Sequence, residues 1–171
     1  MADNTITLEL QVDADQVTKS LGYRFLDAGG ASIYRDRGRC AGTYHFDKGD
    51  RIVTRVVVSA KAGETVEVAV TDLSLVSVST LLPGKHDLSL FDAMSACQSI
   101  GQWGVPERHR KGDETLIVFT SSDVLTVASE NGQWQMSGYL SLVVETAAGK
   151  TPRLFYFDPE STSGNGGDVP Q

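Results

Sequence analysis

Residues 133–145 read QWQMSGYLSLVVE, and this stretch decides the fold class. Its large apolar side chains share every second position: Trp134, Met136, Leu140, Leu142 and Val144. Polar side chains take most of the positions between them. Because successive side chains of a strand point to opposite faces, this period of two predicts a long, half-buried β-strand. The Asn131-Gly132 pair before it is typical of a hairpin turn.

The same alternation recurs in shorter pieces along the chain. The other predicted strands are residues 5–12, 41–46, 52–59, 66–70, 73–79, 115–119, 124–128 and 153–157. Turn-forming residues such as Gly, Asp and Asn separate them every few positions. Short strands at this spacing predict an all-β fold, and specifically an antiparallel β-sandwich that is jelly-roll-like.

Residues 80–113 interrupt the pattern. They contain Pro83-Gly84, a predicted short helix over 88–97 that Asp87 caps, and the charged run 107–111. We therefore expect one long loop that carries a short helix. Loops of this length are uncommon in compact domains and are often functional.

The length of 171 residues predicts a single domain. We place this β-sandwich domain at residues 1–158. From residue 159 the chain is rich in Gly and Ser, which predicts a flexible tail over 159–171. Hydrophobic residues make up 40% of the chain and charged residues 22%, as is ordinary for a soluble globular protein.

The formal net charge of −7 argues against two classes of partner. Nucleic acids and anionic membrane surfaces are bound by basic proteins, so we expect neither as a partner. No apolar run approaches the roughly 20 residues that span a bilayer, so we expect no membrane span. Residues 1–4 lack the features of a secretory signal, which predicts a cytoplasmic protein. Cys40 and Cys97 are then expected to be reduced thiols, although their spacing leaves a disulfide between them open.

The sequence contains no catalytic motif and predicts a protein that is not an enzyme. The three histidines have no metal-ligand spacing, and no Gly-x-Ser-x-Gly elbow occurs. We therefore predict no catalytic residue and no cofactor. A hydrolase site built from distant strands stays open as a residual alternative.

Three residues are candidates for ligand binding. Trp103 lies in the long loop between glycines, where its ring could stack on a ligand or could close the end of the core. Asp47 and Asp50 lie in a turn, where carboxylates could bind calcium or could cap the backbone.

Three segments together resemble a known bacterial family. They read GTYHFD at 42–47, WQMSGYL at 134–140 and RLFYFDPE at 153–160. On these segments the chain resembles the inclusion-body protein family typified by PixA and AidA. The resemblance implies a non-enzymatic, abundant cytoplasmic protein, linked to quorum sensing, virulence and host interaction. The name-giving inclusion protein is methionine-rich, whereas this chain has three methionines, which argues against a storage role.

Two hypotheses about function follow. The first is a self-associating protein that forms a homo-oligomer by edge pairing or sheet stacking. The strand from Gln133 is the candidate edge, with Tyr139 and Val143 as interface residues on its otherwise polar face. The second is a lectin-like module that binds a glycan or small ligand through Trp103 and the turn carboxylates, with or without calcium.

Overall fold

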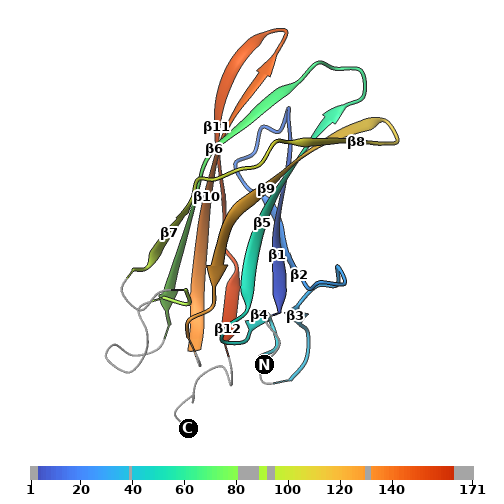
Figure 1. Cartoon of the computed structure of the whole chain (residues 1–171). Helices are drawn as coiled ribbons and strands as arrows, with labels where there is room; N and C mark the ends of the chain where they lie inside the picture. The colour runs from blue at the N-terminus through green and yellow to red at the C-terminus, as the bar shows by residue number, and fades with distance from the viewer. Residues whose placement is uncertain (1–3, 39, 81–88, 92–94, 130–131, 164–171) are drawn as a thin grey trace.

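The computed structural model describes residues 4–38, 40–80, 89–91, 95–129 and 132–163, with side chains described as far as Pro159. These residues form strands, turns and loops, with no helix among them, so the all-β prediction is confirmed. The strands lie in two sheets, which Figure 1 shows as two layers of long strands. We call them sheet A and sheet B.

Sheet A has five strands. In spatial order they are β2 (Gly22–Leu26), β1 (Thr5–Asp13), β5 (Arg51–Lys61), β9 (Glu114–Thr126) and β8 (Glu107–Lys111). Sheet B has seven strands. In spatial order they are β3 (Tyr34–Arg35), β4 (Thr43–Phe46), β12 (Glu160–Ser163), β10 (Gly132–Thr146), β6 (Glu67–Ser79) and β7 (Cys97–Ile100), and β11 (Gly149–Phe157) also pairs with β10.

The long strand predicted at 133–145 is β10, and it is the centre of sheet B. It pairs with β6 on one side and with β11 and β12 on the other. The side chains of Trp134, Met136 and Leu140 are buried, as the period of two predicts. In Figure 1, β10 and β11 form a long hairpin that projects from one end of the molecule.

One hydrophobic core joins the two sheets. Sheet A contributes side chains from β1, β2, β5 and β9, and sheet B contributes side chains from β4, β6, β10 and β11. The ring of Phe25 in sheet A meets the ring of Phe46 in sheet B edge to face, with centroids 5.2 Å apart. Such aromatic pairs add to the free energy gained by burying apolar area.

Two strand pairs are parallel, so the antiparallel prediction is wrong for them. β1 runs parallel to β5, with Thr5 opposite Arg51, and β12 runs parallel to β4. Between β1 and β5 the chain leaves sheet A through β2, passes through β3 and β4 in sheet B, and returns. Parallel neighbours require a long crossover of this kind.

The predicted helix over 88–97 is wrong where the structure describes it. Residues 88 and 92–94 lie outside the described part of the chain, as does the proposed cap Asp87. Residues 89–91 are not helical, because Leu90 bonds to β6 and to the segment after β9: its N–H donates to the Ser77 hydroxyl at 3.0 Å, and its carbonyl accepts from the Ala128 N–H. The backbone of Cys97 belongs to β7.

Two predicted irregular segments contain strands. The charged run 107–111, expected in the long loop, forms β8 at the edge of sheet A. Residues 160–163, assigned to the flexible tail, form β12 between β10 and β4. Residues 164–171 of that tail lie outside the described residues.

Gly138 marks a close approach within sheet B. It lies opposite Phe157, and a Cβ atom at position 138 would overlap the Phe157 ring. Phe157 is itself buried in the core, so its ring has little room to move. Glycine is therefore required here for packing.

We predict that Gly138→Ala lowers the free energy of unfolding by about 2–3 kcal/mol, because overpacking forces the core to shift. Chemical denaturation of the variant measures the loss. Gly101→Ala is the matched control, since nothing lies within 4 Å of a Cβ added there. Equal stability of the two variants would contradict the packing argument.

Candidate functional site

Four apolar side chains lie together on the outer face of sheet B, and we call them the outer stripe. They are Tyr139 and Val143 of β10 and Leu154 and Tyr156 of β11. Tyr139, Leu154 and Tyr156 are 49%, 56% and 51% exposed, and Val143 is half-buried. Tyr139 lies directly opposite Tyr156, and Leu154 lies opposite Ser141, so they occupy adjacent positions.

The sequence predicted an edge strand at Gln133, and this is wrong. β10 has hydrogen-bonded neighbours on both sides, so its backbone groups have no free edge to offer along the paired residues. Tyr139 and Val143 therefore belong to a sheet face. Any contact that they make with a partner would stack on this face.

Backbone groups at two sheet borders are protected against edge pairing. β8 carries Glu, Arg, His, Arg and Lys in succession, all exposed, and charged edges resist pairing with another chain. On the far side of β11, Tyr156 exchanges backbone hydrogen bonds with Lys19 and Leu21 at 2.8 and 3.0 Å. Pro152 is four residues before Tyr156, so its backbone faces the same side of β11, and it has no N–H to donate.

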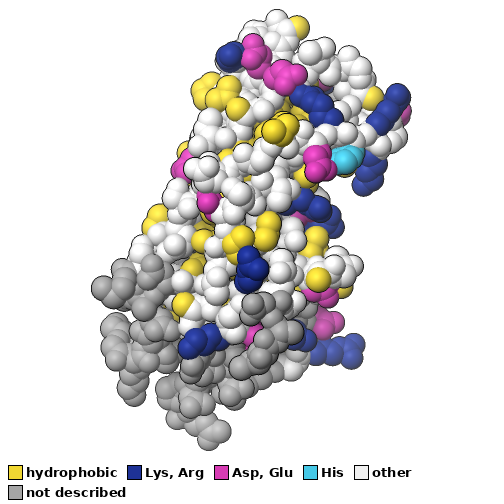
Figure 2. Space-filling model, viewed as in Figure 1, with side chains coloured by type: hydrophobic (Ala, Val, Ile, Leu, Met, Phe, Trp, Pro, Cys, Tyr) yellow, Lys and Arg dark blue, Asp and Glu magenta, His cyan; other side chains and the backbone are white. Residues whose placement is uncertain are grey.

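The charged side chains around the outer stripe already have partners. Lys150 lies 3.2 Å from the Glu145 carboxylate, and Arg108 lies 2.8 Å from Glu67. In Figure 2, the visible face carries hydrophobic side chains in separate patches, with acidic and basic side chains interspersed. A partner docked on the stripe would therefore meet a polar border in which acidic and basic side chains are paired, with no excess of one charge.

Asp47 and Asp50 stabilise their own turn. The carboxylate of Asp50 accepts a hydrogen bond from the Asp47 N–H at 2.8 Å, and the Asp50 N–H donates to the Asp47 carbonyl at 3.0 Å. Burial raises the pKa of Asp50, although the Asp47 hydrogen bond and the nearby His45 act in the opposite direction. The side chain of Asp47 is 75% exposed. Among the described residues, no group of three or more His, Cys, Asp and Glu side chains could hold a metal ion.

Trp103 is half-buried and packs against the core. Its backbone bridges to Ser121, and the Asp123 carboxylate accepts from the N–H groups of Gly101 and Gln102 at 3.0 and 2.9 Å. These bonds hold the loop at the point where the register of β9 shifts. The Trp103 ring packs against the core, and its Nε1 is buried with no hydrogen-bond partner in the described structure.

The structure does not bring Trp103 and the 47–50 turn together. Ser121 lies in the part of β9 where the register shifts opposite Thr54 of β5. Asp50 precedes β5 and is four positions from Thr54, which is about 13 Å along a strand. This backbone spacing argues against one small ligand that contacts both.

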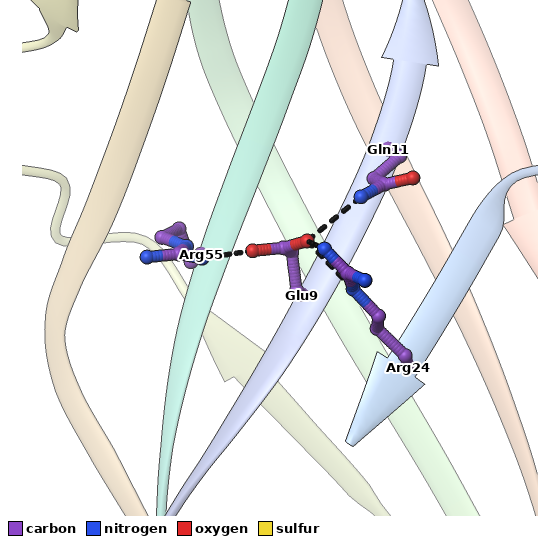
Figure 3. Close-up of polar contacts among 4 residues, drawn as sticks. All are labelled: Glu9, Gln11, Arg24 and Arg55. Atoms are coloured by element: carbon purple, nitrogen blue, oxygen red, sulfur yellow. Dashed lines mark hydrogen bonds and ion pairs between the residues drawn. The ribbon is translucent and has the colours of Figure 1, made fainter. Parts of the chain in front are cut away.

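A polar cluster on the outer face of sheet A was not predicted from the sequence. Glu9 of β1 lies between Arg24 of β2 and Arg55 of β5, which are its direct neighbours in the sheet. Arg24 Nε donates to Glu9 Oε1 at 2.8 Å, Gln11 Nε2 donates to the same oxygen at 2.7 Å, and Arg55 Nη2 donates to Oε2. Figure 3 shows the two guanidinium groups approaching the carboxylate from opposite sides.

The cluster buries a carboxylate on a face that is otherwise open to solvent. The Glu9 side chain is 2% exposed, whereas those of Arg24 and Arg55 are 51% and 42% exposed. Burial raises the pKa of Glu9, but the hydrogen bonds from Arg55, Arg24 and Gln11 and the charge of Arg55 outweigh it, so the pKa is lowered. In the sequence the cluster is visible only as one acidic residue and two arginines at outward-facing strand positions. Only the pairing of β1 with β2 and β5 shows that they are neighbours.

Both cysteines are free thiols, Cys40 half-buried and Cys97 exposed. None of the residues that the structure describes forms a helix long and apolar enough to cross a bilayer.

No family model matches the chain, and no curated protein matches it. Among solved structures, the chain is similar to an inclusion body protein, PixA, from Burkholderia cenocepacia J2315. The two are 9% identical, the match covers 95% of this chain and 97% of that chain, and the TM-score is 0.44. At this TM-score the likeness carries no argument about function.

We predict that Glu9→Gln lowers the free energy of unfolding at pH 7 by about 1–3 kcal/mol, because it leaves two guanidinium groups without their carboxylate. The pKa of Glu9 is below its unfolded value of 4.5, so its contribution is present above that pH and is lost as the pH falls through the folded pKa. The gap between wild type and variant should therefore narrow below about pH 4.5.

Denaturant titrations at several pH values measure this gap. Glu107→Gln is the control, since that carboxylate is exposed at the sheet edge. A Glu9→Gln variant as stable as the control at pH 7, or a gap that does not change with pH, would count against the prediction.

Proposed function

We propose that this protein is a non-enzymatic, self-associating protein that acts through the outer stripe of sheet B. The supporting observation is the adjacency of Tyr139, Tyr156 and Leu154, each about half exposed on the outer face of sheet B. Large aromatic side chains clustered on a surface are typical of protein interfaces.

A second copy of the chain fits this stripe for three reasons. The stripe lies on one sheet face, and a two-fold axis along β10 would place β11 of each copy over β6 of the other. Glu67 and Lys150 lie at the two sides of one cross-strand row, so this arrangement sets Lys150 of each copy over Glu67 of the other, while the two Glu145 side chains between them face each other. Edge pairing is disfavoured at β8 by its charged side chains and at β11 by its backbone bonds to residues 19 and 21.

The family resemblance supports the same proposal. It adds a cytoplasmic location, control by quorum sensing and a role in host interaction and virulence, which we propose together with it. We also propose that the two sheets, which share one core, form a jelly-roll-like β-sandwich. The absence of catalysis stays a prediction from the sequence.

The glycan-binding alternative requires Trp103 and the 47–50 turn to contact one ligand. Trp103 packs against the core, and Asp50 bonds to its own turn. We therefore do not propose a joint site from these residues, with or without calcium.

Light scattering on the purified protein tests self-association. We predict that wild type shows a mass above the 18.4 kDa of one chain, and that the double variant Tyr156→Ser, Leu154→Ser dissociates at least about tenfold more readily, which corresponds to about 1.4 kcal/mol. The reason is the loss of the apolar side chains that a second copy would bury.

Val105→Ser is the matched control, because Val105 is equally apolar and 92% exposed but lies in a loop outside the stripe. Its association should equal that of wild type. A wild-type protein that stays strictly monomeric at high concentration would refute the proposal.

A further inference from the structure

The arginines beside Glu9 have more hydrogen-bond donors than partners. A guanidinium group carries five N–H donors. Arg24 uses Nε and Nη2 on Glu9, and Arg55 uses Nη2. Within the described part of the chain, the Nη1 groups of both arginines donate no hydrogen bond, and Arg55 Nε is buried without a partner.

The two guanidinium groups are fixed in place and remain accessible. Each is held by a carboxylate that is itself almost completely buried, while about half of each arginine side chain faces solvent. Side chains ordered in advance lose less conformational entropy when they bind a ligand. Figure 3 shows both groups on the same face, one on each side of Glu9.

The local charge is favourable for an anion although the whole chain is acidic. Two guanidinium groups and one carboxylate leave a net charge of +1 at this point, on a chain with a net charge of −7. The neighbouring outward positions on β1 and β5 are Thr7, Gln11, Val53 and Val57. None of them is a carboxylate that would repel an anion.

Satisfying Glu9 does not by itself require both arginines. One guanidinium can pair with a carboxylate through two parallel N–H donors. A second arginine brings a like charge near the first, and buried ion pairs contribute little net stability compared with apolar packing. The second arginine instead adds a further donor group beside the first, on the opposite side of Glu9.

We infer that Arg24 and Arg55 form a binding site for a tetrahedral oxyanion of the phosphate or sulfate type, either free or carried as a monoester. The exposed N–H groups of the two guanidinium forks contact the oxyanion. Glu9 is a positioning residue that orients both arginines from below. The site lies on sheet A, so it is independent of the outer stripe on sheet B.

Titration of the full-length protein with inorganic phosphate, in a chloride buffer of low ionic strength, tests the site by calorimetry and by backbone amide NMR shifts. Binding is expected with a dissociation constant on the order of 1 mM, because the site is shallow and solvated. Glycerol 3-phosphate is titrated in parallel. Tighter binding of this monoester would show that the site prefers a phosphate ester, and equal binding would show that the free phosphate ion is enough.

Arg24→Lys and Arg55→Lys keep the charge but lose the fork, so each should weaken phosphate binding at least about fivefold. Arg51→Lys is the matched control, because Arg51 is an exposed arginine at the start of the same strand β5, and its affinity should be unchanged. Melting curves confirm that each variant is folded, and the two test variants are judged separately. No amide shift near β1, β2 and β5 with phosphate, or equal affinity in all three variants, would overturn the site.

Discussion

The pairing of β10 on both of its sides is the constraint on which the rest of sheet B depends. β6 follows it from Trp134 to Glu145, and β11 and β12 divide its other side. A shift of one residue in either register would exchange the buried and exposed faces of the strand. Gly138 opposes such a shift, since only a residue without Cβ leaves room for the Phe157 ring. The exposed stripe and the buried core are therefore two results of one register.

The strands with clear alternation were predictable from the sequence. β1, β5 and β10 lie within one or two residues of the predicted ranges, because each has one buried face. The predicted pairs 66–70 with 73–79 and 115–119 with 124–128 are single long strands, β6 and β9, which bend through register shifts. The pattern could not show which strands pair or in which direction, since period two is the same in parallel and antiparallel sheets. β2 was missed because it has only five residues beside a polar, glycine-rich segment.

The candidate sites were less predictable than the fold. Tyr139 and Val143 were placed on the outward face correctly, but their neighbours Leu154 and Tyr156 come from another strand. Asp47, Asp50 and Trp103 were selected by residue type in loops, and the structure accounts for each through turn bonding or packing. The cluster of Glu9, Arg24 and Arg55 depends on three strands that are far apart in the chain, and no local pattern identifies it.

The burial of Glu9 has a consequence for how sheet A assembles. β1 has two neighbours, and each contributes one arginine to the same carboxylate. If β1 paired one position out of step with both neighbours, Glu9 would be a dehydrated negative charge without a counter-ion. Apolar side chains, by contrast, tolerate exchange with others of similar size. The ion pairs of Glu9 with Arg24 and Arg55 therefore help to specify which strands pair in sheet A and in which register.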